Sequence, residues 1–282
     1  MGSVYGLIAL GLTLIFGIMR VINFAHGALL MVAMFISYFS VTYFGLHPYL
    51  SLILVAPTMF IIGYSINHFL IAPVLEKESN VREPVSALLL TAGLMIILEN
   101  LLLTVGGADY KTINVDFGGS MELGSVIIPY DRFYAFLLAL IATIIFYWFL
   151  MRTEVGRAIR ALGQDRNAAR LMGINTKRIF SIAFGIGMVL LSVAAVALIP
   201  FYTLHPALIN EVFGVLAFMV VVLGGLGSIP GALIGGLLIG TVQSVATMFV
   251  PSTMAQMIVF AFFLVFLFIR PAGIFGFKAD SV

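Results

Sequence analysis

Long apolar runs with almost no charge follow one another along this chain. Nine of them are marked in its 282 residues, at 2–19, 28–44, 49–71, 85–105, 133–151, 179–203, 212–223, 231–249 and 254–269. A run of roughly 20 apolar residues crosses the hydrocarbon core of a bilayer as a helix. We therefore expect an all-α, polytopic membrane protein of eight or nine transmembrane helices in a single domain, residues 1–282. The seventh run is too short to cross, so it is either re-entrant or continues into the glycines after it.

The composition excludes several classes of protein. Only 9% of the residues are charged, against about a quarter in a soluble domain, and the mean hydropathy is +1.18. The absence of cysteine excludes disulfides, thiolate zinc sites and cysteine nucleophiles. The sequence has no phosphate-binding Gly-x-x-x-x-Gly-Lys-Ser/Thr loop, and its four histidines, which lack metal-ligand spacing, are His26, His47, His68 and His205. We expect no metal, no cofactor and no ATP hydrolysis by this chain.

Half of the basic residues lie in one loop, 152–178. Seven of the fourteen are there, namely Arg152, Arg157, Arg160, Arg166, Arg170, Lys177 and Arg178. Because Lys and Arg accumulate in cytoplasmic loops, this loop is predicted to be cytoplasmic. Counting spans from it places the loops at 20–27 and 72–84 and the tail inside, and the loop 106–132 and the amino terminus outside. One miscounted or re-entrant span would reverse the position of the amino terminus.

The basic loop also contains a short predicted helix. The carboxylate of Asp165 is positioned to cap its start, and Gly173 to take the left-handed conformation that ends it. Such an element either docks on a partner protein or lies on anionic lipid headgroups, and the residue pattern alone leaves both open. The candidate docking residues are Asp165, Arg166, Asn167, Ala168, Ala169, Arg170, Leu171, Met172 and Gly173.

A faint internal repeat relates the two ends of the chain. Residues 5–9 align with 213–217, and residues 27–30 with 231–234. In both halves an apolar run is interrupted by glycine-rich or polar sequence, at 20–27 and at 224–231. Matched broken segments point to a translocation pathway, whether the repeat is parallel or inverted. The candidate pathway or gate residues in these segments are Asn23, His26, Gly27, Gly225 and Gly227. Asn23 and His26 would brace the gate by hydrogen bonds or line the pathway; the alternative is that they only satisfy backbone groups freed where the helix ends.

Among the polar side chains within the apolar runs, three are singled out: Glu99, Asn100 and Gln243. A carboxylate inside a span costs roughly 2.5–3.5 kcal/mol on insertion scales, so Glu99 should face protein or a water-filled cavity. The alternative is that Glu99 reaches the outer interface, which is only six residues away at Val105. All three are further pathway candidates. The glycines that recur every four residues from Gly227 predict close helix packing.

Four stretches resemble a known family. Residues 167–173, Asn-Ala-Ala-Arg-Leu-Met-Gly, are similar to the Glu-Ala-Ala-x-x-x-Gly loop of ABC importer permeases, with Asn167 where many have glutamate. Residues 5–11, 22–27 and 222–231 resemble the LivH-type permeases of branched-chain amino acid ABC transporters. The resemblance implies a multi-pass protein of the bacterial inner membrane whose loop 152–178 couples to ATPase subunits. It further implies two ABC ATPases, a second, LivM-type permease and an extracytoplasmic solute-binding protein as partners.

Two functions of different classes follow. The first is the permease subunit of an ABC importer, not itself an enzyme, which carries leucine, isoleucine and valine or a related small solute such as urea or a short amide. The second is an ion-coupled secondary transporter that works without ATPases. The latter class needs an ionisable group in the membrane, and Glu99 is the candidate. Neither function involves nucleic acid.

Overall fold

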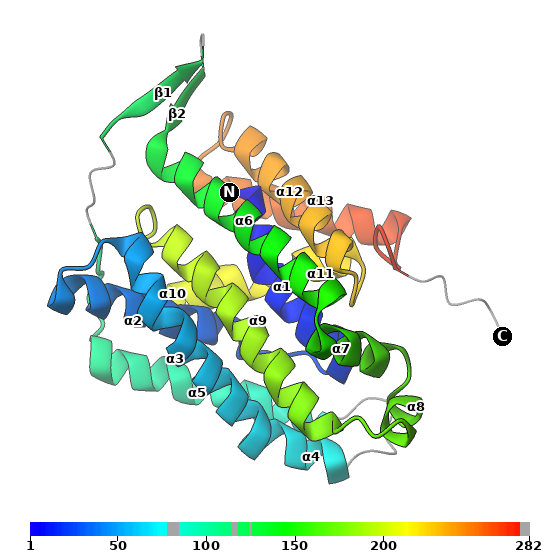
Figure 1. The fold of residues 1–282 in the computed structure, drawn as a ribbon. Coiled ribbons are helices and arrows are strands. Elements are labelled where there is room, and N and C mark those ends of the chain that lie inside the picture. Colours follow the sequence, from blue (N-terminus) through cyan, green and yellow to red (C-terminus); the bar gives the residue numbers. More distant parts are fainter. Residues whose placement is uncertain (78–84, 114–117, 124–125, 277–282) are drawn as a thin grey trace.

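The computed structural model describes residues 1–77, 85–113, 118–123 and 126–276, and it is almost entirely helical (Figure 1). A two-stranded antiparallel sheet, in which Ser120 pairs with Pro129, connects α5 to α6. The elements are α1 Gly2–Met19, α2 His26–Phe44, η1 Pro48–Ser51, α3 Leu52–Ser65, η2 Ile66–Ile71, α4 Ala72–Lys77, α5 Val85–Gly106, β1 Ser120–Leu123, β2 Val126–Pro129, α6 Tyr130–Arg152, α7 Glu154–Gln164, α8 Arg166–Leu171, α9 Thr176–Leu198, α10 Pro206–Ile209, η3 Asn210–Gly214, α11 Val215–Gly224, α12 Ile229–Ala246 and α13 Ser252–Ile269.

The helices confirm a polytopic membrane protein. Within the described residues, eight helices are long and apolar enough to cross a membrane. A ninth, shorter apolar stretch is longer than the predicted run 212–223, because α10, the π-helix η3 and α11 follow one another without a break over 206–224. The apolar pattern of the sequence did not predict the beginning of this helical stretch, because Asn210 and Glu211 interrupt the pattern. The helical stretch thus begins earlier than the predicted run, at Pro206, and it ends at Gly224 without continuing into the glycines that follow.

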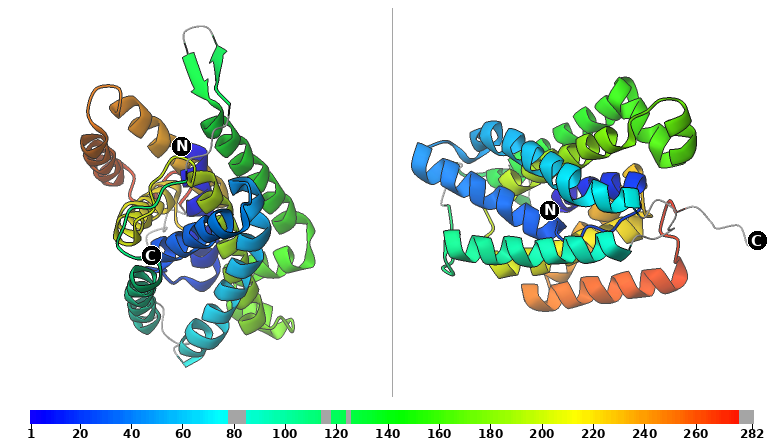
Figure 2. Two further views of the ribbon diagram at one scale, coloured as in Figure 1. Left: turned by 90° about the vertical axis from the view of Figure 1, so that its left-hand side faces the viewer. Right: turned by 90° about the horizontal axis from the view of Figure 1, so that it is seen from below.

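Helices α1 and α9 form the centre of the molecule, and most of their residues are buried. Helix α1 packs on α9 and, antiparallel, on α12, while α5, α6 and α13 lie on the outside of the bundle (Figure 2). These three outer helices carry large apolar side chains that are exposed. These exposed side chains form the surface that faces lipid or other subunits. The predicted close helix packing is found along α12, where Gly236 and Gly240 lie against Gly2 and Gly6 of α1.

Replacing Gly236 with alanine is expected to destabilise the protein. A Cβ atom there would lie 2.8 Å from the Gly2 carbonyl oxygen and would overlap the backbone of Gly6, so α1 and α12 must separate at a cost of about 1–3 kcal/mol. A lower melting temperature of the detergent-solubilised protein is the measurement. Gly93→Ala on α5 is the control, because that site is open and alanine favours a helix. Equal melting temperatures for the two variants would contradict the expectation.

The two ends of the bundle differ in charge. Helices α7 and α8 and the carboxyl end of α1 lie at one end, while the first residue and the β1–β2 hairpin lie at the other (Figure 1). Arg20, Lys77 and the basic residues of 152–178 share the first end (Figure 1). The positive-inside rule predicts that it faces the cytoplasm, and we call it the cytoplasmic end. The amino terminus lies at the opposite end from the basic loop, in agreement with the span count (Figure 1). The predicted inner loop 72–84 and the tail lie partly outside the described residues.

Candidate translocation site

The first broken segment begins where α1 ends. Arg20 has a left-handed backbone, with φ 53°, and the chain returns toward the middle of α1 before α2 starts at His26. The His26 Nε2 donates a hydrogen bond to the Ile8 carbonyl at 2.9 Å, so α2 begins halfway along α1. Asn23 Oδ1 accepts a bond from the Ala25 amide at 3.1 Å. Both side chains are buried. Asn23 bonds within the break, whereas His26 joins the start of α2 to the middle of α1.

The second broken segment is the turn between α11 and α12. Gly225 and Gly227 have φ of 102° and 82°, a region that favours glycine. Ser228 caps α12 through the Gly231 amide, at 3.2 Å. A Cβ atom on Gly227 would lie 3.3 Å from the Gly17 Cα, so this turn packs directly on the last turn of α1. The two halves of the proposed repeat therefore meet at the cytoplasmic end, with α1 and α11 running in the same direction.

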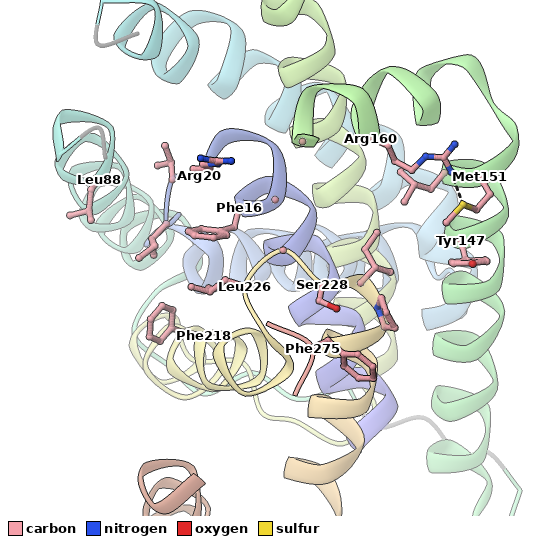
Figure 3. A pocket seen from close by; sticks show the side chains of 18 of the residues that line it. Phe16, Arg20, Leu88, Tyr147, Met151, Arg160, Phe218, Leu226, Ser228 and Phe275 are labelled. Carbon is pink, nitrogen blue, oxygen red and sulfur yellow. Dashed lines mark hydrogen bonds between the residues drawn. The ribbon is translucent and has the colours of Figure 1, made fainter. Parts of the chain in front are cut away.

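Both broken segments line one cavity of about 930 Å³, which we call the inner groove (Figure 3). Its wall is mainly apolar and aromatic, and among the described residues that line it the charged ones are Arg20 and Arg160, both basic. The residues labelled in Figure 3 are Phe16, Arg20, Leu88, Tyr147, Met151, Arg160, Phe218, Leu226, Ser228 and Phe275. The groove thus joins α1, α5, α6, α7, α11 and the turn before α12.

A second polar contact lies away from the groove. The Asn210 Nδ2 donates a hydrogen bond to the Glu99 Oε1, which joins η3 to α5. Gly27 packs on the same asparagine, since a Cβ atom on Gly27 would lie 2.9 Å from the Asn210 carbonyl oxygen and from the Gly214 Cα. Of the two positions considered for Glu99, the structure therefore has the one that faces protein. Asn210 sits in a π-helix, a feature frequent at functional sites.

Sequence reasoning missed Asn210, although a polar residue beside Glu211 at the edge of an apolar run was a usable signal. The other pathway candidates are dispersed. Asn100 is exposed and bonds to Ile96 of its own helix, and Gln243 lies beside the Tyr5 hydroxyl on α1. Gly225 is in the turn but does not line the groove. Of the eight predicted pathway residues, Gly227 alone lines the inner groove.

The short helix predicted in the basic loop is present as α8. Asp165 Oδ1 accepts bonds from the amides of Asn167 and Ala168, at 2.8 and 3.1 Å. Gly173 has φ 83° and ends the helix as expected. Ala169 is buried against the bundle, whereas Leu171 and Met172 are 89% and 83% exposed. Two large apolar side chains thus project from a helix anchored by its other face.

Comparison with known proteins identifies the family. Residues 1–268 match the model of a family described as the permease component of the branched-chain amino acid transport system. The chain belongs to this permease family. It is 32% identical to the LivH permease of Salmonella typhimurium and to the BraD permease of Pseudomonas aeruginosa, in each case over 98% of this chain and 92% of the relative. A fructose import permease of Rhizobium meliloti is 28% identical over 44% of this chain and 35% of the relative. No solved structure matches the permease.

Membership decides between the two functions considered from the sequence. The permease is a non-catalytic component of a multi-component ABC transport system, and the ion-coupled alternative is not supported. It is a multi-pass membrane protein homologous to bacterial inner-membrane permeases.

Proposed function

We propose that this permease carries leucine, isoleucine and valine into the cell as one subunit of an ATP-driven importer. The observation that carries the proposal is the near-full-length match to two permeases named for high-affinity branched-chain amino acid transport. The match to a fructose import permease covers less than half of the chain. Urea and short amides, which the sequence left open, are the competing cargoes.

The proposed complex contains two ABC ATPases, a second, LivM-type permease and an extracytoplasmic solute-binding protein. Helix α8 supports the placement of the ATPases, because its exposed Leu171 and Met172 lie at the cytoplasmic end. The β1–β2 hairpin projects from the opposite end, where a binding protein would deliver the cargo (Figure 1). Loop 152–178 is then the coupling loop of a single transmembrane permease domain.

The proposed pathway leads from the Glu99–Asn210 contact to the inner groove. Both places involve a broken segment, because Gly27 packs on Asn210 and Arg20 lies at the groove. Opening and closing are therefore assigned to the last turn of α1 and the segments 20–27 and 224–231, while the rest of α1 and α9 stay packed.

Transport by the reconstituted complex tests the proposal. The permease is co-purified with its ATPases and second permease, reconstituted in liposomes and supplied with the binding protein. We expect ATP-dependent uptake of labelled leucine, and no uptake without ATP. Uptake of urea or a short amide in preference to leucine would overturn the cargo assignment. Purification of the permease without ATPases would overturn the assembly.

A second expectation concerns the groove. Since the chain has no cysteine, Leu226→Cys is a single reporter in the groove, half exposed. A membrane-impermeant thiol reagent should label it in inside-out vesicles only. Met248→Cys, exposed beyond the outer end of α12, is the control and should be labelled from the opposite side. Labelling of both from one side would contradict the assigned orientation.

A further inference from the structure

One side chain connects α8 directly to the end of α1. The Arg166 guanidinium donates two hydrogen bonds to the Ile18 carbonyl oxygen, from Nε at 3.2 Å and from Nη2 at 2.9 Å. Arg166 is the first residue of α8, and Ile18 is the last but one of α1. The two positions are 148 residues apart in the chain, so this contact exists only because α7 folds back across the end of α1.

A charged donor at the end of α1 is expected to form a strong contact. The last carbonyls of a helix lack partners within it, and a cation there also complements the helix dipole. The guanidinium carbon also lies over the Phe180 ring, 5.3 Å from the ring centroid, which adds a cation–π attraction. Burial, and then the neighbouring Arg20 and Arg170 cations, lower the pKa of Arg166. A guanidinium stays charged at neutral pH even so.

The end of α1 is also a wall of the inner groove. Phe16, Gly17 and Arg20 line the groove, and Ile18 lies between them. The left-handed Arg20 then leads into the broken segment that ends at His26. A shift of α8 that pulls on the Ile18 carbonyl must therefore move this wall and the start of the segment together.

We propose that Arg166 is a positioning residue that transmits movement of α8 to the wall of the inner groove. The inference rests on the proposed function, in which ATPases move α8. Its role differs from that of Leu171 and Met172, because Arg166 faces the bundle and not a partner. Loss of Arg166 should therefore separate ATP hydrolysis from transport while leaving the complex assembled.

The test compares Arg166→Gln with Arg166→Lys in the reconstituted complex. Glutamine cannot supply a charged donor to Ile18, so we expect unchanged recovery of ATPase subunits, ATP hydrolysis within a factor of two of wild type, and leucine uptake lowered roughly tenfold. Lysine supplies one charged donor and should restore part of the uptake. Arg270→Gln, which removes an exposed guanidinium at the same end of the bundle, is the matched control and should transport normally.

Distances between spin labels give a second measurement. Labels at Phe24→Cys, in the broken segment, and Met248→Cys, at the outer end, should change separation when ATP binds to the wild-type background and should not change in Arg166→Gln. Normal uptake by Arg166→Gln, or a label movement that persists in it, would overturn the inference. A parallel loss of ATPase subunits and uptake would also overturn it, because Arg166 would then serve docking. Failure of the wild-type chain to bind ATPases would instead refute the proposed function.

Discussion

Replacing both Leu171 and Met172 with aspartate will leave the permease folded in the membrane but without its ATPase subunits, and leucine uptake will fall to background. Both side chains are almost fully exposed, so their loss removes no contact within the chain. Loss of a hot-spot side chain at a protein interface costs roughly 2 kcal/mol or more, and two buried carboxylates would add an unfavourable desolvation. The affinity should therefore fall more than about a hundredfold.

Co-purification from detergent and uptake in liposomes measure the two effects. Met248→Asp is the matched control, because it places a carboxylate at an equally exposed methionine beyond the outer end of α12. That control should bind ATPases at the wild-type level. Normal ATPase recovery by the double variant would show that α8 is not the docking element and would favour a role on the lipid surface.

The second large effect is expected at Glu99. Glu99→Leu removes the acceptor of the Asn210 amide and leaves that buried donor unsatisfied in the membrane, at about 1–3 kcal/mol. Because Gly27 packs on the same asparagine, the start of α2 should shift as well. We expect a lower melting temperature and leucine uptake reduced roughly tenfold or more.

Glu99→Gln is the matched variant, because its amide oxygen keeps an acceptor for Asn210 without the charge. It should retain most of the uptake and the same dependence of uptake on pH, since no proton coupling is proposed. Loss of uptake by a normally folded Glu99→Gln would contradict this expectation and assign the charge itself to the cargo. A shifted pH profile would restore the ion-coupled mechanism.

Local pattern was sufficient for much of the molecule. The spans follow from apolar length, the orientation from seven basic residues in one loop, and α8 from a capping aspartate and a glycine within nine residues of each other. Each of these properties depends on residues close in sequence and on the solvent around them. The beginning of the helical stretch 206–224 was missed for the same reason, because a local hydropathy average treats Asn210 as an end.

Tertiary structure decided where the chemistry lies. Glu99 and Asn210 are 111 residues apart, and Arg166 and Ile18 are 148 apart, so each pair meets only when several helices have packed. The sequence predicted Glu99, Gly27 and Arg166 as candidates but not their partners. It marked two broken segments, whereas the inner groove they share depends on how α1 lies between α9 and α12. Which helices become neighbours in the membrane depends on where glycines allow their backbones to approach closely. That geometry is a property of the whole bundle and not of any one segment.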